Sequence, residues 1–238
     1  MKNLNLLLIG ATLALPVMAN ATIINSLHDL SQRSWNTSEK GVCSPCHAAH
    51  QTDGDRTRPP LWVHATTTAS TLIPYGTTSK GTAVGLPTGS SLACLSCHDG
   101  TVALNQMING KQIGSPLEMI DPAAQIGPDM HTTHPISILY AVNTNNPSLN
   151  NPDTYKIGDS VPTSGGTAPV PLTWSGTTLI GQSLNTALLG GNYTLQCSSC
   201  HDVHKNVGTS PTSGKMLKIS GTDASNRGSL ICRNCHLK

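Results

Sequence analysis

The stretch Cys43-Ser-Pro-Cys46-His47 decides the fold of this chain, together with three further stretches of the same form. These are Cys94-Leu-Ser-Cys97-His98, Cys197-Ser-Ser-Cys200-His201 and Cys232-Arg-Asn-Cys235-His236. The four motifs contain all eight Cys of the 238-residue chain. With 10 His in the chain, chance would place a His directly after all four second Cys about three times in a million.

This CxxCH pattern predicts covalent attachment of haem. Two thiols spaced by two residues reach the two vinyl groups on one edge of a porphyrin, and the next imidazole can bind the iron from one face. Disulfides, structural zinc and redox dithiols are the other uses of paired Cys, but none of them needs a His after every second Cys. We therefore expect four haem c groups, thioether bonds to all eight Cys, and proximal iron ligands at His47, His98, His201 and His236.

The second axial ligand of each iron decides between an electron carrier and a catalyst, because an open position allows substrate to bind. Six His lie outside the motifs. We expect four of five to be distal ligands, namely His28, His50, His64, His134 and His204. His131 is the weakest candidate, because it stands close to His134 and has no counterpart elsewhere. Met ligation is not expected, since no Met stands in a recognisable ligand context.

Other roles stay open for several of these His. His50 and His204 stand three residues after a proximal His, where a hydrogen bond to a haem propionate is the alternative to iron ligation. His28 stands near the N-terminus, where an exposed, frayed position is the alternative. His64 could pack against a ring instead of binding iron. His134 precedes Pro135, which disfavours a helix and suits a ligand held by a loop.

The first 21 residues read as a secretory signal. A Lys at position 2 is followed by an apolar run from Leu4 to Val17 and by small residues. The run is shorter than the roughly 20 residues of a membrane-spanning helix. We expect a secreted protein, extracellular or at the cell surface, with the periplasm as the alternative, and no membrane span after cleavage of the signal.

The composition predicts a haem-dominated and mostly irregular chain. There is no Phe, and only three Trp and four Tyr are present, while Gly 22 and Pro 16 favour turns. We expect a few short helices near the motifs, at 26–30 and after Cys94, and minor short strands such as 168–174, wrapped around a stack of four haems. Loss of Lys2 and addition of four bis-His haems bring the formal charge of +2 to about −3. Without a basic stripe, no nucleic-acid binding is expected.

A weak repeat organises the chain. Each half runs His, then CxxCHxxH, then CxxCH, which indicates two dihaem units that form one compact body. The expected boundaries are 1–21 for the signal peptide, 22–134 for the first dihaem half, 135–196 for an insertion of loops and extended pieces without haem ligands, and 197–238 for the second dihaem half. The insertion is interpreted as a surface excursion that covers haem edges, with a partner surface as the alternative.

Several segments resemble multihaem cytochromes of metal-reducing bacteria. They are HDLS at His28, CSPCHAAH, PLWVH ending at His64, SLACLSCHDGTVA, HPIS at His134 and CSSCHDVHK. The number and order of the motifs are similar to those of OmcE-like extracellular tetrahaem cytochromes, which polymerise into filaments. The resemblance implies four bis-His haems and one distal His from an adjacent subunit, for which His28 is the candidate. The Ala-Ala before His50 and the paired His131 and His134 depart from the pattern and leave the pairing of His with iron open.

The expected function is electron transfer rather than catalysis. A filament subunit is favoured, with other copies of the chain, redox partner cytochromes and extracellular electron acceptors as partners. A monomeric periplasmic electron shuttle is the first alternative. An oxidoreductase with one open haem is the second, and Asp99 and Asp202 could then act as acids or bases. The surplus of His argues against an open iron.

Overall fold

The computed structural model describes residues 23–38, 41–48, 61–79, 81–140, 148–159, 179–204, 216–219 and 230–237. The predicted signal peptide, the strand predicted at 168–174 and His50 lie outside these ranges. Within them the chain is mostly irregular, with few short helices and two short strands, as its composition predicts. That it wraps a stack of four haems stays a prediction.

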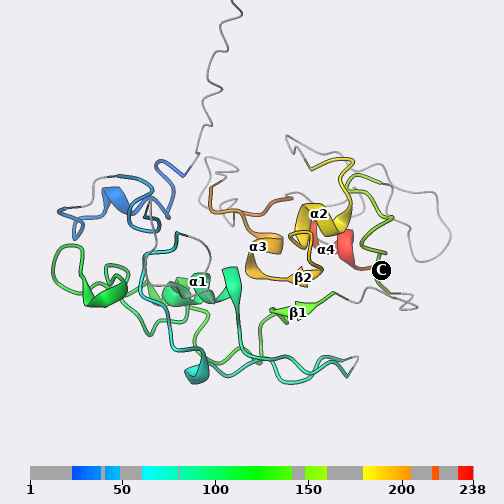
Figure 1. Ribbon diagram of the computed structural model, residues 1–238, viewed down its shortest axis with the longest axis horizontal. Helices are drawn as coiled ribbons and strands as arrows, with labels where there is room; N and C mark the ends of the chain where they lie inside the picture. The colour runs from blue at the N-terminus through cyan, green and yellow to red at the C-terminus, as the bar shows by residue number, and fades with distance from the viewer. Residues whose placement is uncertain are drawn as a thin grey trace, which may run out of the picture.

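The regular elements are short, and they do not stack into layers. The α-helices are α1 (Gly89–His98), α2 (Leu184–Leu188), α3 (Cys197–Cys200) and α4 (Leu230–Cys235). The 3-10 turns are η1 (Leu30–Gln32), η2 (Ala69–Thr71), η3 (Ile108–Gly110) and η4 (Pro122–Ala124). Strands β1 (Ile138–Leu139) and β2 (Thr194–Leu195) pair antiparallel, with Ile138 opposite Leu195. Figure 1 shows the first part of the chain, in blue to green, beside a second part in yellow to red that contains α2, α3 and α4.

Helix α1 ends in the second motif instead of beginning there. Leu92 and Leu95 bury one side of the helix, and Gly100, with φ of 75°, adopts the left-handed conformation that ends it. The helix expected after Cys94 was therefore misplaced, because the apolar residues that stabilise it precede the motif. The helix expected at 26–30 is displaced as well, since only the 3-10 turn η1 forms there.

The largest apolar cluster belongs to the second part of the chain. The largest cluster consists of Tyr140, Tyr155, Ile157, Leu184, Ala187, Leu188, Leu189, Leu195, Ile219, Leu230 and Ile231. Eight of these eleven residues come from the interval 135–196. The interpretation of this interval as a surface excursion is therefore wrong for its described part, which also contains α2. Its loop-like composition concealed a set of apolar residues that are far apart in the sequence.

Two smaller clusters stabilise the first part. Leu72, Leu92, Leu95 and Met130 pack together around α1. Trp35 packs with Met107 and Ile113 in the other. Burial of such side chains contributes roughly 1.5–3 kcal/mol each, and both clusters lie under segments that carry motif residues.

A polar network joins the two parts where α1 lies against α3 (Figure 1). The Ser91 amide donates to Oε1 of Gln196 at 3.2 Å, and the Ser91 hydroxyl donates to the same oxygen. The Cys197 amide donates to the Ser91 hydroxyl at 3.0 Å. The hydroxyls of Ser90 and Ser198 are 2.7 Å apart. These contacts fix the second motif directly beside the third.

Candidate functional site

Each motif forms one helical turn. The amide of the motif His donates to the carbonyl of the first Cys in the first, third and fourth motifs, at 2.9, 3.0 and 2.9 Å, and the second motif lies in α1. A turn of this kind brings residues three and four apart to the same face. The two thiols and the following imidazole are thus presented by a compact backbone unit.

The first and third motifs are held by the same backbone arrangement. His47 forms an antiparallel bridge with Trp62, and His201 forms one with Leu217. The residue after each His donates its amide to the residue before the bridge partner, at 2.9 Å to Leu61 and 2.8 Å to Met216. Leu61 and Met216 both have positive φ, 64° and 48°. The two halves therefore share backbone geometry as well as motif order.

Consecutive motifs are neighbours in space. The thiols of Cys46 and Cys97 interact electrostatically, which places the first motif next to the second. The thiols of Cys94 and Cys197 share a hydrogen bond, and this contact links the second to the third.

The third and fourth motifs are linked in the same way. Cys200 interacts with Cys232 and with Cys235. Each motif thus has the next motif in the sequence as a neighbour, and the first is also close to the segment that follows the third, because His204 stacks on His47.

Burial makes the second Cys of every motif a weak acid, whereas Cys197 is the first Cys of its motif. It raises the pKa of Cys46 and Cys200 to about 11, and that of Cys97 and Cys235 to about 12. Redox dithiols and zinc ligands need thiolate, which a lowered pKa favours. Cys197 differs, because the hydrogen bond with Cys94 lowers its pKa to about 7. The four second Cys therefore lack the lowered pKa that is typical of redox dithiols.

Three predicted distal His lie against three predicted proximal His. The ring of His28 lies 5.9 Å from that of His98, centre to centre. The ring of His204 lies 6.1 Å from that of His47, with planes inclined by 22°. The ring of His134 lies 6.2 Å from that of His236. The first His of each half thus meets the last motif of the same half.

These spacings fit two axial ligands of one iron. With about 2.0 Å from metal to imidazole nitrogen and about 1.1 Å from that nitrogen to the ring centre, two rings on opposite sides of a metal have centres about 6.2 Å apart. All three observed spacings lie within a few tenths of an ångström of this value. The residues present therefore fit a bis-His haem iron at three motifs.

The second ring nitrogen of several of these His is already bound. Nδ1 of His98 lies 2.9 Å from the Ala124 carbonyl, and Nδ1 of His134 lies 2.9 Å from the Pro135 carbonyl. Nδ1 of His204 lies 3.5 Å from Oδ1 of Asp202. A neutral imidazole that donates through Nδ1 keeps its lone pair on Nε2, as metal-binding His commonly do.

His28 is half-buried, and its buried Nδ1 lacks a hydrogen-bond partner among the described residues. Burial lowers the pKa of His28 to about 4, and the positive charge that His98 can carry lowers it further. The ring is therefore neutral near pH 7, the form that binds metal. A buried nitrogen without a partner is unfavourable, and the described residues do not supply the contact that would satisfy it. His201 also lies within electrostatic range of His28.

His64 differs from the other candidates, because both of its ring nitrogens contact backbone. Nδ1 lies 2.7 Å from the Ala65 carbonyl, and Nε2 lies 3.0 Å from the Ala103 carbonyl. The side chain is buried beside Cys97, with Sγ 3.7 Å from Nε2. Burial lowers the pKa of His64, and a neutral imidazole can donate to only one of these two carbonyls. Among the described residues its ring contact is with Trp62 and not with a motif His, which favours packing, the alternative left open by the sequence, over iron ligation.

The remaining polar candidates make local contacts. Nδ1 of His131 lies 2.6 Å from the Asp129 carboxylate, and both side chains are exposed. Asp99 is buried and accepts from the Thr101 amide at 2.8 Å. Asp202 accepts from the His204 amide at 3.0 Å. Both carboxylates thus accept from the amide two residues further along the chain.

Comparison of the chain with protein-family models and with curated proteins found no match. The described residues contain no helix that is long and apolar enough to cross a bilayer. They also contain no group of three or more His, Cys, Asp or Glu arranged to hold a metal ion. A haem iron takes only two protein side chains, which is the number that each His pair offers.

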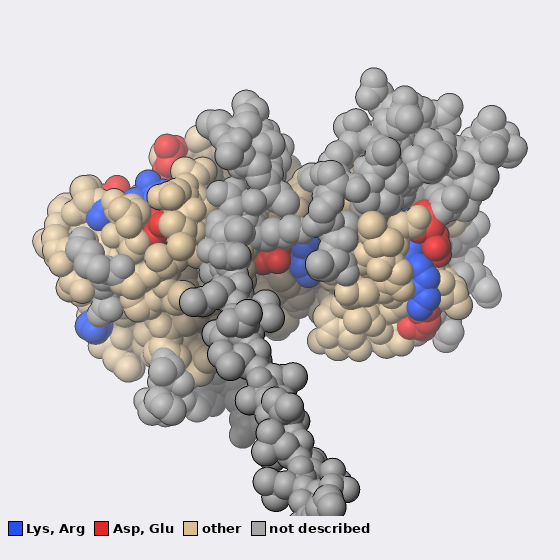
Figure 2. All heavy atoms as spheres, turned by 90° about the horizontal axis from the view of Figure 1, so that it is seen from above, with Lys and Arg blue, Asp and Glu red and all other residues tan. Residues whose placement is uncertain are grey.

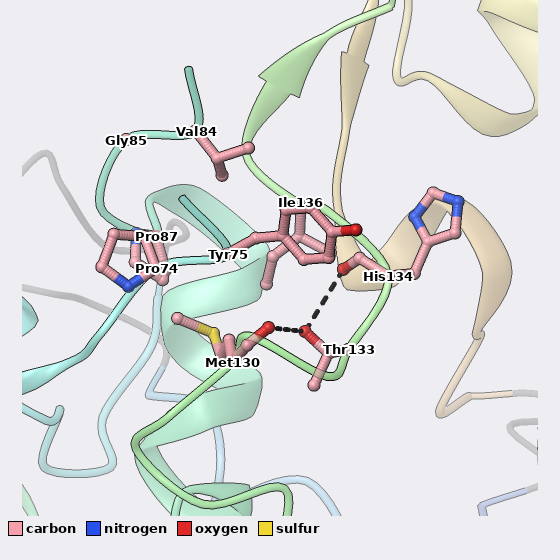
Figure 3. A pocket seen from close by; sticks show the side chains of 9 residues that line it. All are labelled: Pro74, Tyr75, Val84, Gly85, Pro87, Met130, Thr133, His134 and Ile136. Atoms are coloured by element: carbon pink, nitrogen blue, oxygen red, sulfur yellow. Dashed lines mark hydrogen bonds between the residues drawn. The ribbon is translucent and has the colours of Figure 1, made fainter. Parts of the chain in front are cut away.

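His134 borders a small pocket formed mainly by apolar side chains of the first part, including Tyr75, Val84 and Ile136. Figure 3 shows its ring pointing away from the other lining residues, while the Thr133 hydroxyl contacts the carbonyls of Met130 and His134. The loop therefore holds the His134 backbone and directs the ring outward.

On the face seen in Figure 2, acidic and basic side chains are few and interspersed among uncharged residues.

The motif residues could be found by sequence reasoning, and the role of Trp62 could not. Its ring lies edge-on to His47, with centres 5.9 Å apart, and 6.3 Å from His64. The bridge to His47 that places it there has no local sequence signal. Trp62 stands fifteen residues after His47, and Leu217, its counterpart in the other half, stands sixteen residues after His201, so only the two bridges show that they correspond.

Proposed function

We propose that this protein transfers electrons through four covalently bound bis-His haems. The observation that carries the proposal is the approach of three non-motif His to three motif His at ring spacings of 5.9, 6.1 and 6.2 Å. Haem iron takes up and gives up single electrons when bound. With both axial positions held by imidazole, substrate has no free site on the iron, so the chain acts as a carrier.

The polypeptide contributes orientation and spacing. Nδ1 contacts to Ala124, Pro135 and Asp202 hold three imidazoles in the tautomer that leaves Nε2 for metal. The order of the motifs in space brings each attachment site next to the following one. Electrons need close neighbours to pass, and this order supports a single path along the chain.

For the fourth iron, at His201, the proposal assigns His50 as the distal ligand. His50 follows the first motif as His204 follows the third. Since His204 reaches His47 and the two motifs share their backbone arrangement, the reciprocal pairing is His50 with His201. His64 is then the predicted candidate that does not bind iron.

Assembly into an extracellular filament is the second part of the proposal and rests on the resemblance to OmcE-like cytochromes. In that assembly His28 would bind iron of an adjacent copy. The spacing of His28 and His98 supports ligation within one chain instead, so the filament proposed here is held by surface contacts. Redox partner cytochromes and extracellular acceptors would take electrons from its ends.

Electron microscopy and spectroscopy of the native secreted protein test both parts. We expect four haems per chain, all six-coordinate, with a spectrum that does not change on dilution, and thin filaments in negative stain. Rapid binding of CO to the reduced protein would reveal an open iron and favour the oxidoreductase. Monomers with four six-coordinate haems would retain electron transfer and reject the filament.

A further inference from the structure

The indole of Trp62 presents a polar group without a partner. Its Nε1 is buried and has no hydrogen-bond partner among the described residues. The indole N–H can only donate, and a buried donor without an acceptor is unfavourable. An acceptor that is not part of the polypeptide is therefore expected at this position.

The fold does not require a polar group here. Trp62 pairs with His47 as Leu217 pairs with His201, with the same amide contacts on either side. Leu217 occupies the equivalent place with a wholly apolar side chain. Backbone pairing therefore does not explain why the first half has an indole N–H where the second half has an apolar side chain.

The acceptor must lie close to the first motif. The Trp62 ring is edge-on to the His47 ring at 5.9 Å, and His204 covers another side of His47. A haem attached at Cys43 and Cys46 would carry two carboxylates, which are strong acceptors.

We propose that Trp62 donates its indole N–H to a propionate carboxylate of the haem bound at His47. The inference rests on the proposed function, because it requires that haem. A hydrogen bond to the carboxylate spreads its negative charge and weakens the stabilisation of ferric iron. Trp62 is therefore a positioning residue that raises the reduction potential of the first haem.

Two substitutions test the role of the N–H. Trp62→Phe keeps an aromatic ring, and Trp62→Leu reproduces the residue of the second half, so both are compatible with the backbone pairing. Trp35→Phe is the matched control, because Trp35 is buried with Met107 and Ile113 in a separate apolar cluster. Each protein is isolated with its haems, and potentials are measured by spectroelectrochemical titration.

We expect both Trp62 variants to retain four six-coordinate haems and to show a downward shift of one midpoint potential out of four. Trp35→Phe should leave all four unchanged. Equal potentials in the Trp62 variants and the unaltered protein, with four haems present, would overturn this inference and leave the proposed function intact. Absence of haem from the unaltered protein would instead reject the proposed function.

If the Trp62 variants fail to assemble with haem, a measurement on the unaltered protein tests the same inference. The chain has three Trp, and ¹⁵N-labelled indole signals can be followed by NMR. We expect one indole N–H that resists hydrogen exchange and whose shift changes strongly between the ferric and ferrous states. Free exchange of all three would show that water is the acceptor and would overturn the inference.

Discussion

The imidazole ring of His204 stacks on that of His47, with ring centres 6.1 Å apart and planes inclined by 22°. The two residues come from opposite halves of the sequence, so the contact joins the halves at a predicted iron site. Each ring belongs to a segment fixed by the same antiparallel bridge pattern. The pairing is therefore determined by the backbone arrangement of both halves.

Replacement of His204 by Ala should open one haem of four. The first iron loses its distal imidazole, so one quarter of the haem should become high-spin and bind CO on reduction. Electron paramagnetic resonance of the oxidised protein checks this. His131→Ala is the control, because His131 contacts only the exposed Asp129, and it should leave all four haems low-spin. Four low-spin haems in His204→Ala would contradict the pairing.

Replacement of His64 by Ala should leave every haem six-coordinate. Because the ring is buried and can donate to one backbone carbonyl, of Ala65 or of Ala103, its loss should destabilise the fold by about 1–3 kcal/mol. Thermal unfolding of the haem-loaded protein measures the loss. Appearance of a high-spin haem in this variant would show that His64 is a ligand after all.

Substitution of Asp202 by Asn should raise one reduction potential. The Asp202 carboxylate lies 3.5 Å from Nδ1 of His204. Its negative charge makes the imidazole a stronger electron donor to the iron, which stabilises the ferric state. Asn keeps an oxygen for the His204 amide and removes the charge. Asp129→Asn is the matched control, since it changes the same contact at His131. An equal shift in both variants would assign the effect to general surface charge.

Gln196→Ala should weaken the junction of the two halves. Its Oε1 accepts from Ser91 and also from the Ser137 hydroxyl at 3.3 Å. Leaving these donors unpaired should cost about 1–3 kcal/mol, lowering the unfolding temperature. Gln112→Ala is suited as control, because its side chain contacts only the exposed Gly114 carbonyl. Unchanged stability in Gln196→Ala would show that the network does not hold the junction.

The sequence predicts the irregular fold, which the structure confirms, and the attachment residues, which stay a prediction, because both depend on local pattern. Cys spacing and the following His define a motif within five residues, and abundant Gly and Pro limit helix length. The position of α1 was misjudged, since its burial depends on Met130 and Leu72, which no local pattern connects to Leu92 and Leu95.

The pairing of His could not be read from the sequence, because each partner is brought from a distant segment. The repeat groups His134 with the third and fourth motifs, but no local pattern shows that its ring lies against His236 and not against His201. His64 resembles a ligand in sequence, and only its contacts with the carbonyls of Ala65 and Ala103 separate it from the others. The buried role of Tyr140 and Ile157 was hidden in the same way.

Near-infrared magnetic circular dichroism of the fully oxidised secreted protein, with iron and haem quantified on the same sample, tests the central claim most directly. The charge-transfer band reports the pair of axial ligands at each low-spin iron. We predict four haems per chain and a single band type characteristic of bis-His ligation, with no high-spin signal. Fewer than four haems, a Met-ligated band or a stoichiometric high-spin iron would contradict the account.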